Sequence, residues 1–278
     1  MEKRLFPRSL VCPTVLMLAV FALLVSCRQD EPERLPVVPE GAVDMGIVMT
    51  REDGTTYNLY WAESNLSESG LCENPEDFGD YYAWGETEPY YATGHSQDKR
   101  CTEWKKGKNG YYWNSYKWCS SYRGQVKLTR YCPSDKTDFW GGEGSPDDKA
   151  EFREYNYADD PARAVLHGKW RMPTREEWAA LCEQCTWTWT SREGVSGYQV
   201  TASNGNSIFI PATGYRMDDV IREVGSSGNY WSSTMDTGEP VYAWYMFFKK
   251  GRYVGDYSSA RYYGHSVRPV TEPKSRRL

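Results

Sequence analysis

Two cysteines stand three residues apart at Cys182 and Cys185, the spacing found in zinc sites and in thiol redox enzymes. A structural zinc site needs a second pair of ligands, but the other cysteines after residue 30 are scattered singly, at Cys72, Cys101, Cys119 and Cys132. A redox pair belongs at the start of a helix, whereas this pair falls late in a predicted helix. We therefore expect buried thiols or cross-links to distant cysteines, with a pairing that the sequence leaves open.

The histidines and carboxylates form no catalytic pattern in the sequence. The three histidines, His95, His167 and His265, are widely separated. Four carboxylates follow closely on one another at Asp77, Asp80, Glu86 and Glu88, with no nucleophile and base beside them. We expect neither an enzyme nor a cofactor, and the sequence leaves calcium binding open.

A different chemistry is indicated by residues 241–270, VYAWYMFFKKGRYVGDYSSARYYGHSVRPV, where tyrosines alternate with Ser, Gly and Asp. Rigid amphipathic rings separated by small polar residues are typical of recognition surfaces. The period of two sends Tyr242, Trp244, Met246 and Phe248 to one face, predicted to be core, and Val241, Ala243, Tyr245, Phe247 and Lys249 to a solvated face. The predicted ligand-binding residues are Tyr245, Phe247, Lys249, Arg252, Tyr253, Asp256, Tyr257 and Ser259. The alternative is that these are ordinary strand tyrosines, favoured by a half-buried sheet.

The elements that position these residues can be read from local signals. Thr174 and Glu177 have capping-box spacing, and the apolar residues after them repeat with a helical period. Residues 160–168 predict a shorter helix that stops at Gly168. Residues 198–212 predict a hairpin with positive φ at both Asn204 and Gly205. With strands expected over 43–62 and a loop-rich stretch over 63–150, the order of elements indicates an α+β domain.

The long stretch 81–144 has little periodicity but many aromatic residues: Trp84, Trp104, Tyr111, Tyr112, Trp113, Tyr116 and Trp118. So long an irregular segment in a compact domain usually carries function or is poorly ordered. We expect about half of these rings to pack the loop onto the body of the domain.

The N-terminus has the pattern of a targeting segment. Lys3, Arg4 and Arg8 precede an apolar run that is shorter than the ~20 residues of a membrane-spanning helix. The run ends in LVSC, which resembles the bacterial lipobox with Cys27 as the residue to be lipidated. An ordinary buried cysteine after a signal anchor is the weaker alternative, because an acidic, proline-containing linker follows at once.

These features predict an organisation and a location. We expect a lipoprotein signal peptide over 1–26, a linker over 27–40, one domain over 41–270 and a flexible tail over 271–278. Because Arg28 and not Asp follows the cysteine, we expect an outer-membrane lipoprotein, held to the membrane through its lipid alone. The acidic run after the cysteine resembles a surface-export signal, so we expect the domain to face the cell exterior. Residues 1–26 carry three basic residues and one acidic residue, so their removal takes the net charge from −5 to −7. Such a balance opposes binding of nucleic acid.

Seven blocks occur together in a recognisable order: GDYYAWGETEP, YKWC, WRMPTREEW, CTWTWT, IFIPATGYR, YWSST and GHSVRPV. Over about residues 41–270 the chain resembles the Fibrobacter-type major paralogous domain family, which is common among Bacteroidetes lipoproteins. This resemblance implies a C-type-lectin-like fold, related to the formylglycine-generating enzyme and to receptor-binding proteins diversified by retroelements. In the diversified relatives, the variable positions match Tyr245, Phe247 and Lys249.

The chain departs from the active members of that fold. No cysteine follows Cys185 to hold copper, the histidines are not clustered for iron, and Val241 follows Glu239-Pro240 where sugar-binding lectins have a calcium ligand. We expect a surface recognition module for a glycan or a protein. A structural or adhesin-tip component of the envelope is the alternative, and an unrecognised enzyme is the third.

Overall fold

The protein folds mainly into antiparallel strands with few helices, which fits the broad α+β class expected from the sequence. The computed structural model describes residues 38–89 and 110–273, which belong to one compact unit over 37–278. The predicted signal peptide, Cys27, most of the linker, most of the predicted tail and residues 90–109 lie outside the described residues. Those predictions therefore stay predictions.

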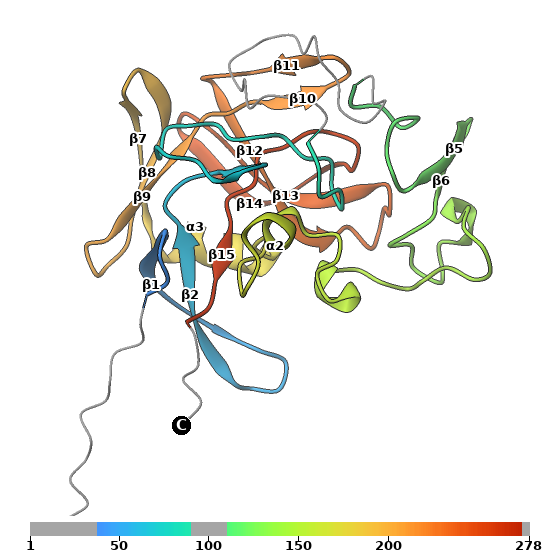
Figure 1. The fold of residues 1–278 in the computed structure, drawn as a ribbon, viewed down its shortest axis with the longest axis horizontal. Helices are drawn as coiled ribbons and strands as arrows, with labels where there is room; N and C mark the ends of the chain where they lie inside the picture. Colours follow the sequence, from blue (N-terminus) through green and yellow to red (C-terminus); the bar gives the residue numbers. More distant parts are fainter. Residues whose placement is uncertain (1–37, 90–109, 274–278) are drawn as a thin grey trace, which may run out of the picture. The chain divides into compact units, whose positions relative to one another are not determined.

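The two ends of the domain meet in one sheet (Figure 1). It consists of β1 (Ala42–Thr50), β2 (Thr56–Ala62) and β15 (Val270–Thr271), in the order β1-β2-β15. The strands expected over 43–62 are therefore confirmed. Val270 pairs with Trp61 of β2, and Arg268 just before it donates hydrogen bonds to the carbonyls of Ala62 and Phe209 and to the Asn65 side chain. Arg268 is therefore a structural residue.

A second sheet contains the predicted hairpin. Its strands are β7 (Thr186–Arg192), β8 (Val195–Thr201) and β9 (Ser207–Pro211), in that order. The turn differs from the prediction, because only Gly205 has positive φ (89°) while Asn204 does not. The Ala202 N–H donates to the Asn206 carbonyl, so the loop is longer than the two-residue turn that needs both residues left-handed.

Both predicted helices are present. Helix α3 (Arg175–Gln184) has its capping box formed, with the Thr174 hydroxyl accepting from the Glu177 N–H and the Glu177 carboxylate accepting from the Thr174 N–H. Helix α2 (Pro161–Leu166) begins at the Asp160 cap. It ends one residue earlier than expected, because His167 already adopts positive φ before Gly168.

A third sheet lies at the centre of the aromatic core. It consists of β12 (Ser227–Met235), β13 (Tyr242–Lys249) and β14 (Arg252–Ala260), with β13 in the middle. One face of the sheet, with Met246 and Phe248, packs on α3, β1, β2 and the β7-β8-β9 sheet. The other face, with Trp231 and Tyr245, packs on α2 and the loops around Trp84 and on His265. Both faces of the central strand therefore have packing partners.

The remaining elements are short hairpins and turns. They are β3 (Leu66–Ser67), β4 (Gly70–Leu71), β5 (Cys119–Arg123), β6 (Gln125–Leu128), β10 (Tyr215–Met217), β11 (Val220–Arg222) and the 3-10 turns η2 (Thr137–Phe139) and η3 (Phe152–Tyr155). Several loop rings are core, as expected: Trp84, Tyr111 and Tyr116 are buried, whereas Trp113 and Trp118 are half-buried. Trp104 lies outside the described residues. Within the described ranges, no helix is long and apolar enough to cross a membrane.

Candidate functional site

Strand β13 alternates as the sequence predicts, but its burial follows the prediction only in part: Met246 and Phe248 are buried as predicted, and several other residues differ. Tyr245 was expected on a solvated face and is only 7% exposed, whereas Tyr242, expected in the core, is 39% exposed. Trp244, also expected in the core, is half-buried under the Arg175 guanidinium, 3.9 Å from the ring centre. The reason is that the middle strand is covered on both faces while its first residues extend beyond the core.

A β-bulge in β14 divides the predicted ligand-binding residues between the two faces. Tyr245 pairs with Tyr257 and Phe247 pairs with Val254, so Gly255 and Asp256 together oppose one residue of β13. An extra residue in a strand reverses which face its side chains point to. The bulge thus places six predicted residues on the Tyr245 face: Tyr245, Phe247, Lys249, Arg252, Tyr257 and Ser259.

The other two predicted residues, Tyr253 and Asp256, lie on the opposite face. Tyr253 stacks on Trp187, with ring centres 4.8 Å apart and planes 14° apart. Asp256 accepts a hydrogen bond of 3.3 Å from Arg175 at the start of α3. Their inclusion with the Tyr245 set was wrong. Tyr253 pairs with Phe248 across the hairpin, and the place of Asp256 depends on the bulge, which the alternation of residue types does not reveal. Tyr253 thus packs β14 against β7, and Asp256 links β14 to α3 at the surface.

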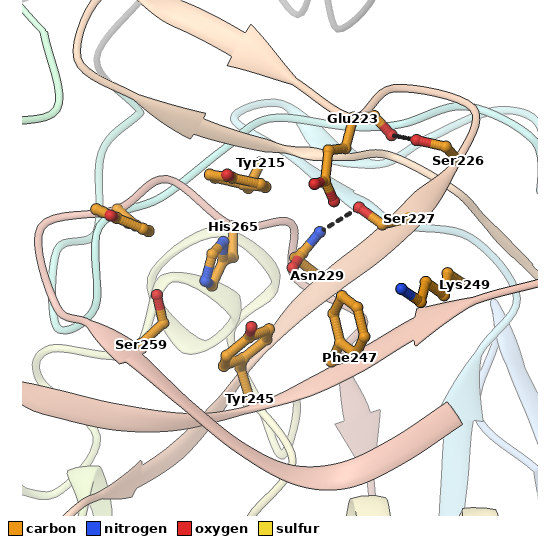
Figure 2. A pocket seen from close by; sticks show the side chains of 11 residues that line it. Tyr215, Glu223, Ser226, Ser227, Asn229, Tyr245, Phe247, Lys249, Ser259 and His265 are labelled. Carbon is orange, nitrogen blue, oxygen red and sulfur yellow. Dashed lines mark hydrogen bonds between the residues drawn. The ribbon is translucent and has the colours of Figure 1, made fainter. Parts of the chain in front are cut away.

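On the Tyr245 face the structure has a pocket of about 360 Å³, here called the His265 pocket (Figure 2). Its walls are aromatic and its floor is polar. The wall residues are Tyr215, Tyr245, Phe247 and Tyr263, and the buried floor residues are Ser227, Asn229, Ser259 and His265. The exposed rim holds Glu223, Ser226 and Lys249. The pocket collects residues from β10, β12, β13, β14 and the segment before β15.

His265 is 1% exposed, and neither of its ring nitrogens has a hydrogen-bond partner among the described residues. Its ring lies 4.1 Å from that of Trp231 and 4.7 Å from that of Tyr245, centre to centre, with Tyr215 edge-on at 6.1 Å. Figure 2 shows the imidazole between the rings of Tyr215 and Tyr245. Burial lowers its pKa to about 3, and the Gly264 carbonyl, which is not in hydrogen-bond geometry, opposes that shift only weakly. The imidazole is therefore neutral at physiological pH, with one donor and one acceptor unused.

The backbone explains why His265 sits where it does. Tyr82 and His265 exchange N–H to carbonyl hydrogen bonds of 3.0 and 3.1 Å, and Ser266 donates to the Asn229 carbonyl. The adjoining Gly264 lies against Tyr111, and a Cβ there would come within 2.5 Å of that ring. The loop is thus held closely by its main chain, while the imidazole itself has no polar partner in residues 38–89 and 110–273.

The other polar groups of the floor are partly satisfied. The Asn229 amide donates to the Ser227 hydroxyl over 3.0 Å, as Figure 2 shows. The Ser259 hydroxyl makes no hydrogen bond within the described part of the chain, and it is 9% exposed. The floor therefore offers several groups that donate and accept, none of them charged.

Charge is confined to the rim. The Glu223 carboxylate points into the pocket in Figure 2. Burial raises the pKa of Tyr215, with the Glu223 charge as the next cause, and burial together with the neighbouring Tyr257 and Tyr215 raises the pKa of Tyr245. Both hydroxyls therefore stay protonated. Lys249 lies on the same rim beside Phe247 (Figure 2), so the rim carries charges of both signs.

A second hollow, of about 590 Å³, adjoins the His265 pocket and is here called the Trp113 hollow. The two share Tyr245, Ser259 and Tyr263 in their linings. The rest of the second lining is Trp113, Val126, Phe139, Val241, Tyr242, Ser258, Ala260 and Tyr262. The loop-rich segment after residue 110 thus contributes aromatic residues beside the candidate site.

The other chemical candidates of the sequence do not come together. Cys182 is half-buried and Cys185 buried, and both are free thiols. Asp80 accepts from the Glu68 N–H and Glu86 accepts from the Lys117 N–H, so both serve the backbone. No group of three or more His, Cys, Asp or Glu that could hold a metal ion occurs in residues 38–89 and 110–273.

Sequence reasoning missed seven pocket residues: Tyr215, Glu223, Ser226, Ser227, Asn229, Tyr263 and His265. Tyr215, Asn229, Tyr263 and His265 stand in or next to blocks quoted for the family resemblance, IFIPATGYR, YWSST and GHSVRPV. Nothing in their spacing shows that they meet, because up to 50 residues separate them in the chain. A comparison with family models, with curated proteins and with solved structures gives no match.

Proposed function

We propose that this chain is a non-catalytic recognition module at the cell surface, and that the His265 pocket is where it binds its ligand, a glycan or a protein. The observation that carries the proposal is the buried, unpartnered imidazole of His265 at the end of an aromatic-walled pocket. A buried polar group without a partner costs about 1–3 kcal/mol of stability. A ligand that hydrogen-bonds to the imidazole offsets this cost only when it is bound.

The form of the pocket also supports binding. Small-molecule sites are concave and largely apolar, with a few placed polar groups, and have volumes of about 300–1,000 Å³. The His265 pocket meets each of these conditions, with four aromatic residues around a polar floor. Four of its residues, Tyr245, Phe247, Lys249 and Ser259, belong to the set expected from the sequence.

The titration properties of the site favour binding over catalysis. A general base works best with a pKa near the ambient pH, and burial holds the pKa of His265 at about 3. Burial likewise raises the pKa of Cys72 and of Cys182 to about 12, so these thiols are protonated and poorly nucleophilic. Neither residue type is set up for turnover.

The C-type-lectin-like fold is also part of the proposal. Its support is the family resemblance together with the antiparallel sheets, the two helices and the pairing of the C-terminal β15 with β2. In this assignment the final strands carry the ligand face, which agrees with the position of the His265 pocket.

The binding proposal is tested by screening the purified chain against glycans and surface proteins and then comparing two tyrosine variants. Tyr215→Ser removes a wall of the pocket, and Tyr253→Ser removes a partly exposed ring from the opposite face of the sheet. We expect each specific ligand to lose at least tenfold in affinity with Tyr215→Ser and to keep its affinity with Tyr253→Ser. Equal effects of the two substitutions would contradict the assignment of the site.

The proposed anchor is tested by metabolic labelling with palmitate in a bacterial host that processes lipoproteins. We expect label in the unmodified chain and in Cys12→Ser, and none in Cys27→Ser. The labelled chain should fractionate with the outer membrane, and protease added to intact cells should digest it. Equal labelling of Cys27→Ser would contradict the proposed lipid anchor at Cys27 and would leave the proposal about the pocket unaffected.

A further inference from the structure

We propose that the His265 pocket binds one neutral sugar ring of a glycan and that the Trp113 hollow takes the next unit of the same chain. This inference rests on the proposed function, since it names the ligand of the same site. It is based on the linings of the two adjoining hollows, which are aromatic and polar but uncharged, except for Glu223 and Lys249 on the rim of the His265 pocket.

The floor of the pocket fits hydroxyl groups. Ser259, Asn229 and the neutral His265 each provide a donor and an acceptor, and so does every hydroxyl of a sugar. The unused capacity at His265 and Ser259 is matched by a ligand that can both donate and accept at the same position. A charged ligand group at this depth would lose its hydration with no counter-charge on the floor to offset the cost.

The walls fit the apolar face of a sugar ring. Tyr215 and Tyr263 stack with ring centres 5.8 Å apart and planes 12° apart, while Tyr245 and Phe247 stand edge to face at 6.4 Å. Such rings give flat apolar surfaces with hydroxyls at their ends. A pyranose has a C–H face and a hydroxylated edge, so it can lie on a ring and point its hydroxyls at the floor.

The charges argue against a cationic ligand. Aromatic walls near a carboxylate, such as Glu223 here, can bind ammonium groups. Lys249 lies on the same rim, however, and repels a cation that approaches Glu223. The charges of Glu223 and Lys249 are exposed to water and of opposite sign, so together they favour neither a cationic nor an anionic ligand, and they do not disfavour a neutral one.

The Trp113 hollow indicates that the ligand is an oligosaccharide with more than one sugar unit. It continues from the pocket across the shared residues Tyr245, Ser259 and Tyr263. Its lining contains no charged residue and adds the rings of Trp113 and Tyr242. A ligand that leaves the pocket over Ser259 therefore meets another neutral aromatic surface, as the next unit of an oligosaccharide would.

The experiment measures the affinity of the purified chain for three sets of probes by calorimetry. The first set is neutral mono- to tetrasaccharides of hexoses and N-acetylhexosamines, the second is matched glycans with uronic or sialic acid, and the third is a trimethyl-lysine peptide. We expect neutral glycans to bind, with disaccharides at least tenfold tighter than monosaccharides. Tyr242→Ala, at an exposed position of the second hollow, should remove that gain and leave monosaccharide binding unchanged, whereas Tyr215→Ser should weaken both.

The outcomes separate this inference from the proposed function. If acidic glycans or the peptide bind best and Tyr215→Ser abolishes their binding, the pocket is a recognition site but not for neutral sugars. If no neutral glycan binds, the inference is overturned. If chain length brings no gain, or Tyr242→Ala weakens mono- and disaccharides alike, the second subsite is overturned. If a probe binds specifically but its affinity does not depend on Tyr215, the pocket is not the binding site and the proposed function fails as well.

Discussion

The two faces of the β12-β13-β14 sheet are built from the same residue types but treat their polar groups differently. On the Phe248 face, the Tyr230 hydroxyl donates to the Pro211 carbonyl and the Tyr198 hydroxyl to the Lys249 carbonyl. On the Tyr245 face, the His265 imidazole has no partner within the described residues. Both faces are rich in aromatic residues, and the buried Trp61 Nε1 in the Phe248 cluster also has no partner within the described residues. What distinguishes the Tyr245 face is that its unpaired polar group lines a pocket.

This contrast indicates that the first face is built for stability and the second for a ligand. An unpaired buried polar group lowers the stability of a fold, and binding sites commonly contain such destabilising groups because function needs them. The same sheet thus supplies a rigid, closed side that positions an open, polar side.

The largest expected effect is on the closed face. Phe248→Ala should lower the free energy of unfolding by about 3–5 kcal/mol, because Phe248 is fully buried against Tyr198 and Tyr230. Urea unfolding measures this loss. Tyr257→Ala, at a residue 43% exposed on the open face, is the control and should cost less than about 1 kcal/mol. Similar losses for both would mean that the two faces do not differ in this way.

A smaller effect concerns pH. Because burial lowers the pKa of His265 from 6.5 to about 3, the unfolded chain takes up a proton near pH 6.5 that the folded chain refuses. Stability from this group is therefore complete above pH 6.5 and falls by about 2 kcal/mol between pH 7 and pH 5.

The control for this pH effect is His265→Phe, which has no proton to bind at that position. Buried Asp160 acts in the opposite direction, since its pKa is raised to about 6, and Glu223 faces the same pocket. Asp160 and Glu223 are present both in the unmodified chain and in His265→Phe. The change in unfolding free energy between pH 7 and pH 5 is measured for each by urea unfolding, and the difference between the two changes is due to His265. An equal change of unfolding free energy in both proteins would show that the imidazole is solvated in the folded chain.

Tyr253→Ala should cost about 1 kcal/mol of stability, because its ring stacks on Trp187 on the closed face. Its thermal melting should shift downward while affinity for any pocket ligand stays constant. A loss of affinity with unchanged melting would return Tyr253 to the binding face and contradict its pairing with Phe248 on the closed face.

The smallest effect is expected for Asp256→Asn. Its ion pair with Arg175 is exposed, and such pairs contribute about 0–1 kcal/mol. Thermal melting at low and high salt should differ little between the variant and the unmodified chain, and binding should not change. A tenfold loss of affinity would show that Asp256 contacts the ligand.

The parts that the sequence predicts well depend on neighbours in the chain. The capping box of Thr174 and Glu177 and the alternation along β13 are local, so their residue types suffice. The bulge at Gly255-Asp256 is not encoded by alternation, and it decides the faces of Asp256, Tyr257 and Ser259, whereas Tyr253 lies opposite Phe248 without it.

The pocket itself depends on long-range pairing. His265 reaches Tyr215 because its backbone pairs with Tyr82 and because Gly264 pairs with Arg216, contacts that no spacing in the sequence reveals. Burial of Tyr245 was missed for the same reason, since its cover comes from Trp231 and His265.

The central claim is that His265 is present for a ligand and not for the fold. His265→Phe keeps a flat ring of similar shape and removes an unpaired buried donor and acceptor, a change that is neutral or stabilising for a group with no partner. His265→Gln keeps one donor and one acceptor and serves as the matched variant. The measurement pairs thermal melting at pH 7 with affinity for the ligand found in the screen.

We predict that His265→Phe melts at or above the temperature of the unmodified chain and binds at least tenfold more weakly, while His265→Gln retains part of the affinity. If His265→Phe melts well below the unmodified chain and its folded fraction binds normally, the imidazole is a structural group and the account is wrong.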